Sequence, residues 1–363
     1  MLKNNIDSNR LEVVGYDPTI LSCGNFLVLD NDIAEISCNI NGLHIYPLVK
    51  ALEHIQHVRD NLFFKLVDKD KNDYTRKAFE SDPVGYYIKV DPGIKLEEPV
   101  QAAFLLCTPD STQIIHNIIE LGDNSQLNIV NGCTTARHEN RGRHIGITEI
   151  YLRKGSRLGY TMLHSWGADV EVFPFGVTEV EEKGRFISNY VGMTSVKKIV
   201  SYPVAYVKKQ GSARFYSVIY ARPESNFDMG AKAVLEGDEA SGEIISRVVS
   251  EGGNVTSRQM LDGRVSGSLG HMECSGLMLN DHGVIHSIPE LRGAHPDIHL
   301  SHEASVGRIS TEELSYLMTR GLSEEQARAL IIRGFLDIKI EGIPAKVQQL
   351  IDDAIERSIS GTI

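Results

Sequence analysis

Alternation of apolar and polar positions dominates the middle of the chain, between about residues 85 and 309. Short runs of β-branched and aromatic residues stand between turns of small residues, a pattern typical of strands rather than helices. The clearest runs are residues 86–90, 126–130, 148–152, 214–220 and 242–249. The pattern therefore predicts a strand-rich core over residues 85–309.

Small-residue turns punctuate this core, and most lie roughly 30 residues apart or at simple fractions of that spacing. They occur at 122–125, 154–156, 210–212, 236–238, 251–253 and 281–283. A loose period without a strict sequence repeat favours a solenoid of stacked coils, so we predict a mainly β fold with a parallel β-helix core. A jelly roll or a β-sandwich is the competing fold, because turn spacing alone does not fix topology.

The segment before the core, residues 1–84, is predicted to be a small and mostly helical N-terminal region. Leu48, Leu52, Ile55 and Val58 recur there at helical spacing, with charged residues between them. This spacing indicates a helix face that packs against the core, and not a binding site.

The segment after the core, residues 310–363, is predicted to be a helical C-terminal region. Ser310 with Glu313, and Ser323 with Gln326, match the capping-box pattern that begins a helix. Apolar residues at helical spacing follow each cap. These two caps therefore predict two short helices in succession.

Gly321 and Gly334 are expected to end these two helices, and a third helix is expected after Pro344. The apolar face of the third helix would consist of Val347, Leu350, Ile351 and Ile355. Two short helices joined at a glycine also resemble a DNA-binding helix-turn-helix. The second helix carries only two arginines in an acidic chain, so protein docking or capping of the solenoid is the better interpretation.

Composition excludes several classes of partner. The 363 residues include 48 acidic and 37 basic side chains, a net charge of −11, which disfavours nucleic acid and anionic membrane surfaces. No apolar run reaches the roughly 18 residues that span a bilayer, and the first residues lack the apolar stretch of a secretory signal. The five cysteines at 23, 38, 107, 133 and 274 are odd in number and widely spaced, so we expect a reducing, cytoplasmic location.

Potential metal ligands are concentrated in residues 270–308. Six of the 13 histidines lie between His271 and His302, together with Cys274 and several acids. Thiolate, imidazole and carboxylate groups are the ligands of iron and zinc sites. The spacing matches no recognised metal motif, so a polar strand edge with scattered surface histidines is the alternative on composition alone.

Strand geometry orders these candidates. If residues 297–303 are extended, Leu300 and His302 share one face with Ile298, while His299 and Glu303 share the other. The apolar pair should face the core, which turns Glu303 outward toward a partner and makes it the better ligand. His302, turned inward, is either a ligand or a satisfied core histidine. Cys274 can ligate as a thiolate only if it is exposed and its pKa is lowered.

Several segments together resemble the SufB/SufD family of the SUF iron–sulfur cluster assembly system, in its SufB-type and compact archaeal form. The most specific is the Ser-His-Glu-Ala run at 301–304 with its continuation through 307–309, 312–327 and 333–335. Further likeness occurs at 90–101, 131–134 and 160–166. The resemblance implies a right-handed parallel β-helix between helical terminal regions.

The resemblance also implies roles for individual residues. Cys274 matches the cysteine that holds the nascent cluster, and Glu303 and His302 match the acid and histidine beside it. Cys133 and Trp166 match residues implicated in sulfur handling inside the β-helix. The SufD type keeps a histidine at position 302 but lacks the acid at 303, so this chain is SufB-like.

Partners follow from the same resemblance. The C-terminal helices are expected to dock a SufC-like ABC-type ATPase through residues Leu314, Leu317, Met318, Arg320 and Gly321. The chain itself has no phosphate-binding loop and no nucleophile elbow, so ATP hydrolysis belongs to the partner and the chain is not an enzyme. A sulfur donor and apo-protein acceptors of the cluster are also implied.

The number of ligands points to a second chain. An iron–sulfur cluster takes four protein ligands, whereas this region has one cysteine, so two chains related by a two-fold axis are expected to share a transient cluster. A homodimer supplies Cys274 twice, together with Glu303, His302 or His299.

Two other functions remain to be weighed against the scaffold. One is a SufD-like accessory subunit that admits iron or supports a scaffold without holding the cluster. The other is a β-helix carbohydrate-active enzyme, which needs two carboxylates beside a groove. An aromatic content of 7% with one tryptophan is poor for stacking sugars.

Overall fold

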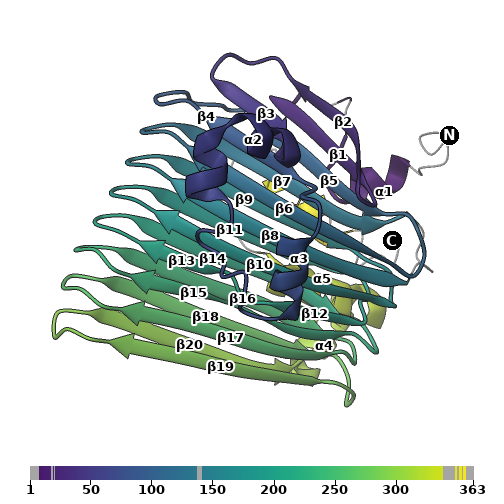
Figure 1. Ribbon diagram of the computed structural model, residues 1–363. Helices are drawn as coiled ribbons and strands as arrows, with labels where there is room; N and C mark the ends of the chain where they lie inside the picture. Colours follow the sequence, from purple (N-terminus) through teal and green to yellow (C-terminus); the bar gives the residue numbers. More distant parts are fainter. Residues whose placement is uncertain are drawn as a thin grey trace.

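The computed structural model describes residues 8–17, 19, 21–136, 141–337, 348–349, 351–353 and 355–356. Within these residues the chain forms a parallel β-helix whose coils stack along one axis (Figure 1). Two ten-stranded sheets make its walls; sheet A has the order β2-β1-β5-β7-β9-β11-β14-β16-β18-β20, and sheet B has the order β19-β17-β15-β12-β10-β8-β6-β4-β3, with β13 beside β10 and β15. Neighbouring coils pair in parallel, which confirms the β-helix and excludes the jelly roll and the β-sandwich.

The strands of sheet A are β1 (Gly24–Leu29), β2 (Asp32–Cys38), β5 (Val100–Leu106), β7 (Gln126–Thr135), β9 (Arg157–Ser165), β11 (Arg185–Gly192), β14 (Ser212–Ala221), β16 (Ser241–Ser250), β18 (Leu269–Met278) and β20 (His299–Arg308). The strands of sheet B are β3 (Leu43–Pro47), β4 (Tyr86–Val90), β6 (Ser111–Leu121), β8 (Gly142–Leu152), β10 (Val170–Val180), β12 (Lys198–Ser201), β13 (Val204–Val207), β15 (Asn226–Leu235), β17 (Asn254–Gly263) and β19 (Val284–Gly293). All five predicted runs lie within strands.

The repeat is conformational rather than sequential. At the turns that lead from sheet B into sheet A, equivalent residues adopt the left-handed region, with φ of 56° at Asn124, 66° at Gly155, 61° at Lys183 and 55° at Gln210. Asparagine and glycine tolerate this region readily, whereas other residues adopt it only when their surroundings demand it. The sequence therefore shows turn signals without a strict repeat.

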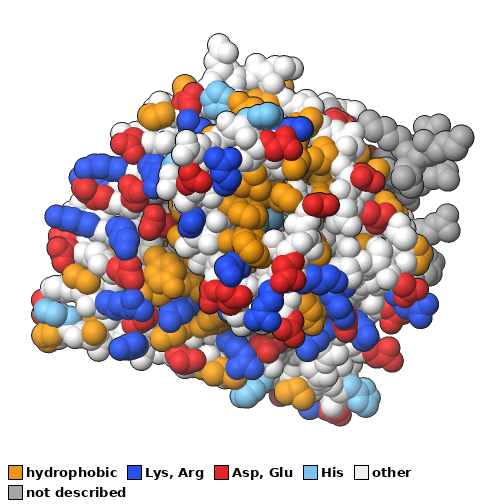
Figure 2. All heavy atoms as spheres, in the orientation of Figure 1, with side chains coloured by type: hydrophobic (Ala, Val, Ile, Leu, Met, Phe, Trp, Pro, Cys, Tyr) orange, Lys and Arg blue, Asp and Glu red, His pale blue; other side chains and the backbone are white. Residues whose placement is uncertain are grey.

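Ion pairs between neighbouring coils stabilise this row of turns. Lys154 pairs with Glu182 at 3.0 Å, and Lys208 pairs with Glu236 at 2.6 Å. Figure 2 shows basic and acidic side chains interspersed along the edge where these turns lie. Each exposed pair contributes little, but the series matches charges from coil to coil.

The N-terminal region differs in part from the helical prediction. It contains α1 (Ser8–Val13), α2 (Leu48–His54), the π-helix η2 (Val58–Leu62) and α3 (Asp73–Glu80), but also the three strands β1, β2 and β3. The strands extend both sheets beyond the first coil, with β2 antiparallel to β1 and β3 antiparallel to β4. An open sheet end exposes unpaired backbone groups, and these strands cover it.

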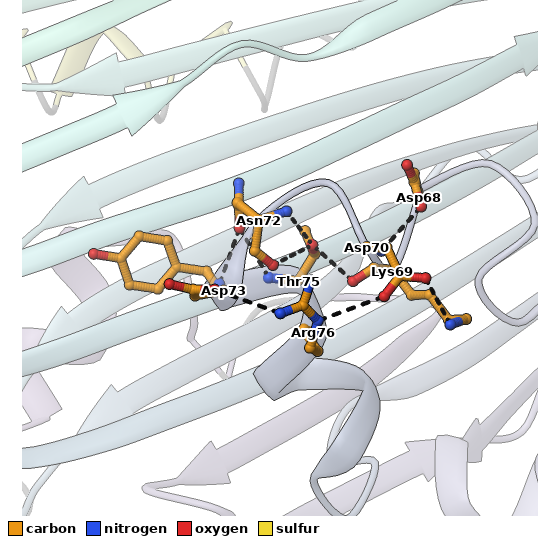
Figure 3. Close-up of polar contacts among 8 residues, drawn as sticks. Asp68, Lys69, Asp70, Asn72, Asp73, Thr75 and Arg76 are labelled. Atoms are coloured by element: carbon orange, nitrogen blue, oxygen red, sulfur yellow. Dashed lines mark hydrogen bonds and ion pairs between the residues drawn. The ribbon is translucent and has the colours of Figure 1, made fainter.

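Helix α3 begins at a complete capping box. The Asn72 side chain accepts hydrogen bonds from the backbone N–H groups of Tyr74 and Thr75, and Thr75 Oγ1 accepts one from Asn72 N–H (Figure 3). Arg76 reaches both Asp70 and Asp73, which ties the helix to the loop before it. The first turn is thereby satisfied without help from the core.

The segment from α2 to α3 packs on the outer face of sheet B (Figure 1). Of the predicted helix face, Leu48 and Val58 are buried in a cluster with Tyr87, Ile118 and Tyr151, and Leu52 and Ile55 pack partly buried against the same cluster.

Glu149 holds the loop between η2 and α3. Its side chain is 0% exposed. The carboxylate oxygens accept hydrogen bonds from the backbone N–H groups of Phe64, Leu66 and Val67, with N···O distances of 2.7, 2.6 and 3.1 Å. His116 Nε2 lies 2.9 Å from the same carboxylate. A buried carboxylate needs such partners, since its desolvation would otherwise disfavour folding.

The C-terminal region contains α4 (Thr311–Thr319) and α5 (Glu324–Leu336). Ser310 caps α4, because its hydroxyl oxygen accepts a hydrogen bond from the backbone N–H of Glu313. The hydroxyl itself donates to Glu312, and the predicted bond from the Ser310 N–H to the Glu313 side chain is not among the contacts of this cap. Ser323 and Gln326 form the complete capping box that was predicted for α5.

Gly321 follows α4 with φ of 96°, as a helix stop requires, but Gly334 does not end α5, which continues to Leu336. Burial of Ile332 and Leu336 against sheet A outweighs the weak helix propensity of the glycine. Of the predicted third helix, Val347 and Leu350 lie outside the described residues, while Ile351 and Ile355 are buried in the same cluster. Among the described residues no helix is both long and apolar enough to cross a bilayer.

Replacing Glu149 by alanine is expected to lower the free energy of unfolding by about 3 kcal/mol, because the buried His116, the buried N–H of Val67 and two half-buried N–H donors lose their acceptor. Urea unfolding followed by circular dichroism measures the change. Glu179→Ala, at a partly exposed position on the next strand of the same sheet, is the control and should cost within about 0.5 kcal/mol. Equal losses in the two variants would show that the Glu149 contacts contribute nothing specific.

Candidate functional site

The candidate ligands lie in the last two coils, on strands β18 and β20. These strands pair in register, with Met272 opposite His302 and Cys274 opposite Ala304. Leu300 packs against the core, while His299 and Glu303 are exposed. The alternation predicted for residues 297–303 is therefore the one that the structure has.

Cys274 faces the interior. Its side chain is 2% exposed, and its thiol donates to Ser257 Oγ at 3.5 Å across the interior, from sheet A to β17 of sheet B. Ligation by Cys274 requires an exposed thiolate, and in this conformation the thiol is covered. Only one further coil separates it from the end of the solenoid.

That last coil is open. Leu291 of β19 and Val306 of β20 occupy inward positions, yet they are 45% and 50% exposed. Strands β19 and β20 are also the edge strands of their sheets, so one side of each has no strand partner among the described residues. Exposed apolar side chains next to unpaired strand edges are the features of a surface that pairs with another chain.

His302 shares the inward face with Cys274. Met272, which stands opposite His302, is two residues from Cys274 along β18, so the imidazole and the thiol are diagonal neighbours. His302 Nε2 is buried and has no hydrogen-bond partner among the described residues, and the same holds for Ser287 Oγ and Gln259 Oε1. Buried polar atoms are normally satisfied, so His302 is not a satisfied core histidine and its free nitrogen is suited to bind a ligand.

Glu303 lies on the opposite face of sheet A. It stands in register with Glu273, which pairs with Arg247 at 2.6 Å; the hydrogen bond from this arginine holds the pKa of Glu273 below its ordinary value. Glu303 and Cys274 therefore do not meet within one chain. No group of three or more His, Cys, Asp or Glu side chains in the described part of the chain is arranged to hold a metal ion.

A second polar group lies deep in the interior around Cys133. This thiol is 3% exposed, and burial raises its pKa well above the ordinary value, so it is protonated at neutral pH. His164 stands beside it in register on β9, with Nδ1 3.2 Å from Tyr190 Oη. The rings of His144 and Trp166 lie 5.0 Å apart, and those of His164 and Trp166 lie 5.5 Å apart.

Burial keeps both histidines neutral. It lowers the pKa of His144 to about 3, and it lowers that of His164 well below the ordinary value, with the nearby His144 adding to the effect. His144 Nδ1 lies 2.8 Å from Gln113 Oε1. Among the described residues His164 Nε2 and Trp166 Nε1 have no partner. The group thus combines a thiol with free polar nitrogens in an enclosed space.

One inward column of sheet A connects the two thiol regions. Asn131, which is two residues before Cys133, begins a register that continues through Met162, Tyr190, Ser217 and Ser246 to Cys274. Ser217 Oγ donates to Ser246 Oγ at 2.9 Å. A cavity lies along this column, with Tyr160 and Tyr190 near one end and Ser246 and Gln259 near the other.

Sequence reasoning missed the residues that line this column. Ser217, Ser246 and Ser257 occupy inward positions where apolar residues prevail, and Gln259 does the same on β17. A polar residue at an inward position of an alternating strand is the signal that identifies them. The signal is usable only once the inward face of each strand is known.

The predicted docking residues lie on and just after α4, which buries none of its residues. Leu314 and Leu317 are half-buried, while Met318, Arg320 and Gly321 are exposed. A groove of about 580 Å³ separates this helix from the turn between β18 and β19, with Leu314 and Met318 on one side. Arg308 and Asp281, which both line this groove, form an ion pair at 2.5 Å.

Comparison with known proteins agrees with this architecture. Residues 104–335 match the family described as SUF system FeS cluster assembly, SufBD core domain. An iron–sulfur cluster assembly SufBD family protein of Archaeoglobus fulgidus is 41% identical over 97% of this chain and 95% of its own length. A protein of the same description from Methanothermobacter thermautotrophicus is 36% identical, over 96% and 86%. The iron–sulfur cluster assembly protein SufB of Bacillus subtilis is 29% identical over 77% of this chain and 61% of its own length.

His144 should make the protein acid-sensitive. An unfolded histidine titrates near pH 6.5, whereas the pKa of His144 in the folded protein is about 3, so between these values only the unfolded state gains the proton. Stability is therefore lost as pH falls below 6.5, by about 2 kcal/mol between pH 7 and pH 5. In His144→Gln this loss should shrink by about 2 kcal/mol in urea titrations at the two pH values.

The exposed His54, replaced by glutamine, is the control and should leave the pH dependence unchanged. An unaltered pH dependence in His144→Gln would contradict a neutral buried imidazole.

Proposed function

The chain belongs to the SufBD family of iron–sulfur cluster assembly proteins, and we propose that it is the scaffold subunit that holds a nascent cluster at a dimer interface. The observation that carries the proposal is that Cys274 and the unpartnered Nε2 of His302 are diagonal neighbours on the inward face, near the open end of the solenoid. The cluster is the cargo of this protein, and the chain itself catalyses no reaction.

A second copy of the chain completes the site. Four ligands are needed, and two copies meeting end to end offer two Cys274 thiolates and two His302 imidazoles. The exposed inward residues Leu291 and Val306 and the free edges of β19 and β20 support such a meeting. Glu303 and His299, which face outward on the same strand, are the candidates for exchange or additional ligands when the cluster enters or leaves. Mixed sulfur and nitrogen ligation should hold iron less firmly than four thiolates, as transfer to an apo-protein acceptor requires.

Sulfur is proposed to enter through the interior. Cys133 would take the outer sulfur of a persulfide on a donor protein, whose own thiol is released, with Trp166 and the neutral histidines around Cys133 excluding water. The polar column from Asn131 to Ser246 then leads toward Cys274. The five free cysteines, among them the buried Cys133 and Cys274, fit a reducing cytoplasm.

Energy is proposed to come from a SufC-like ABC-type ATPase docked on α4. This helix buries none of its own residues and adjoins the groove beside the last two coils. Movement of α4 on ATP hydrolysis by the partner would shift the strand ends around Asp281 and Arg308 and open the last coil. The covered position of Cys274 makes such an opening a requirement of the proposal.

The cluster prediction is tested by anaerobic reconstitution with iron and sulfide in the presence of the ATPase and ATP. Wild-type protein should gain the visible absorbance of a bound cluster. Cys274→Ser should lose nearly all of it and His302→Ala at least half, because each removes a ligand from both copies. Cys107→Ser, in a half-exposed position remote from the last coils, is the matched control. Full absorbance in Cys274→Ser would favour the accessory, SufD-like role.

The docking prediction uses charge on the apolar side of α4. Leu314→Glu together with Leu317→Glu should weaken the complex with the ATPase at least tenfold, about 1.4 kcal/mol, because a carboxylate must be desolvated at the interface. Co-purification and calorimetric titration measure the effect. Val49→Glu, an exposed apolar position on α2, is the control. Unchanged affinity in the double variant would place the docking surface elsewhere.

A further inference from the structure

Many charges on neighbouring coils of this protein are paired with an opposite charge. Arg143 on β8 pairs with Glu171 on β10 at 2.7 Å, and Arg258 on β17 pairs with Asp228 on β15 at 2.6 Å. In a parallel stack each side chain stands beside its equivalent on the next coil, so like charges in register repel and opposite charges attract. Arg143 and Glu171 are such a register pair, whereas Arg258 stands opposite Gly230 and reaches Asp228 from a diagonal position.

Arg157 and Arg185 are two like charges in register, and neither is paired with an opposite charge on a neighbouring coil. They stand in register on the adjacent strands β9 and β11, which lie about 4.8 Å apart. Both are exposed, and neither side chain makes an ion pair or a hydrogen bond with the described residues. The chain has 48 acidic residues, more than its 37 basic ones, so a lack of carboxylates does not explain why these two arginines are unpaired. Two uncompensated arginines in register reduce stability, which indicates that they bind something outside the chain.

The two arginines line a groove on the outer face of sheet A. The groove has a volume of about 400 Å³ and crosses β7, β9, β11, β14 and β16. Gly159 forms part of its floor; a Cβ atom there would lie 2.2 Å from Asn128 Oδ1, so only glycine fits beside this buried amide and the groove stays deep. Arg214, near the far end, adds a third guanidinium, which also lies 3.7 Å from Glu243.

The groove continues toward the proposed cluster site. A second hollow of about 330 Å³ shares Arg214 and Ser241 with it and reaches His271 and His299. Together they form one track along the outside of sheet A, from the middle of the solenoid to its open end.

We propose that this groove binds an extended acidic peptide segment of a partner protein, lying across the coils. Five neighbouring strands span about 20 Å, which matches about six extended residues and is too long for a single small anion. Guanidinium groups bind carboxylates through two parallel hydrogen bonds, and Arg157 and Arg185 stand side by side along the groove. The charge of the groove is complementary to such a segment and opposite to that of the chain as a whole.

The identity of the partner rests on the proposed function. A peptide bound in this track would bring the rest of its protein close to His271 and His299. The segment therefore belongs to a protein that delivers iron or sulfur to the scaffold or receives the cluster from it. The affinity of the groove for an acidic peptide does not depend on the scaffold function, because the experiment uses protein without a cluster.

The test is fluorescence anisotropy with fluorescein-labelled hexaglutamate as the probe and hexaglutamine as the neutral counterpart. Wild-type protein should bind hexaglutamate and not hexaglutamine, with an affinity that falls as salt rises. Arg157→Gln combined with Arg185→Gln should weaken binding at least tenfold. This double variant should unfold at the same temperature as wild type or higher, because it removes a repulsion, so misfolding will not mimic the result.

The matched control removes two exposed charges elsewhere. Arg59→Gln combined with Arg76→Gln changes net charge equally and should bind hexaglutamate within twofold of wild type. Equal weakening in both double variants, or no binding of hexaglutamate, would overturn the proposal. So would full displacement of the probe by equimolar inorganic phosphate, which would reduce the groove to a site for single anions. A change of oligomeric state in the Arg157/Arg185 variant would assign the groove to a second copy of the chain instead.

Discussion

In-register stacking of parallel coils is the constraint on which the rest of this structure depends. Each residue of a strand lies beside its equivalent on the coil before and the coil after, so side chains form columns along the axis. A column is inward or outward along its whole length, because the side-chain period of a strand is two. Core packing, charge matching and the polar route through the interior are all properties of columns rather than of single coils.

The proposed site follows from the place where stacking ends. Cys274 has a coil on both sides and is covered, whereas Ala304, its neighbour in the same column, belongs to the last coil and is exposed. A thiol one coil below an open end is protected until that end is engaged or displaced. In the proposed scaffold, this arrangement would separate the state in which the thiol is covered from the state that accepts a cluster.

Much of the fold could be predicted from the sequence, because strand runs and turn signals are local. The strand residues 86–90 and the turn at 154–156 need only alternation and small residues to be recognised. Strands β1, β2 and β3 were missed because they form only by covering the first coil, which is a tertiary demand. The same holds for Gly334, where burial of Leu336 carries the helix past a residue that usually ends one.

The sequence names candidate site residues, but it does not determine how they are arranged. Alternation within β20 places Glu303 outward. That Cys274 is inward follows from the register of β18 against β20, which neither strand's sequence determines alone. For this reason His302, and not Glu303, is the neighbour of the thiol. The polar column through Ser217 and Ser246 was likewise invisible, since it exists only when five strands are aligned.

The left-handed turn positions have an evolutionary consequence. Because Asn124, Gly155, Lys183 and Gln210 repeat a backbone conformation and not a residue, one coil can replace, follow or precede another with little change in the path of the chain. Duplication or deletion of a gene segment that encodes one whole coil between Cys133 and Cys274 would therefore leave a foldable solenoid and alter mainly the distance between these two thiols. The length of such a protein is free to drift in steps of one coil, while the sequence within each coil diverges.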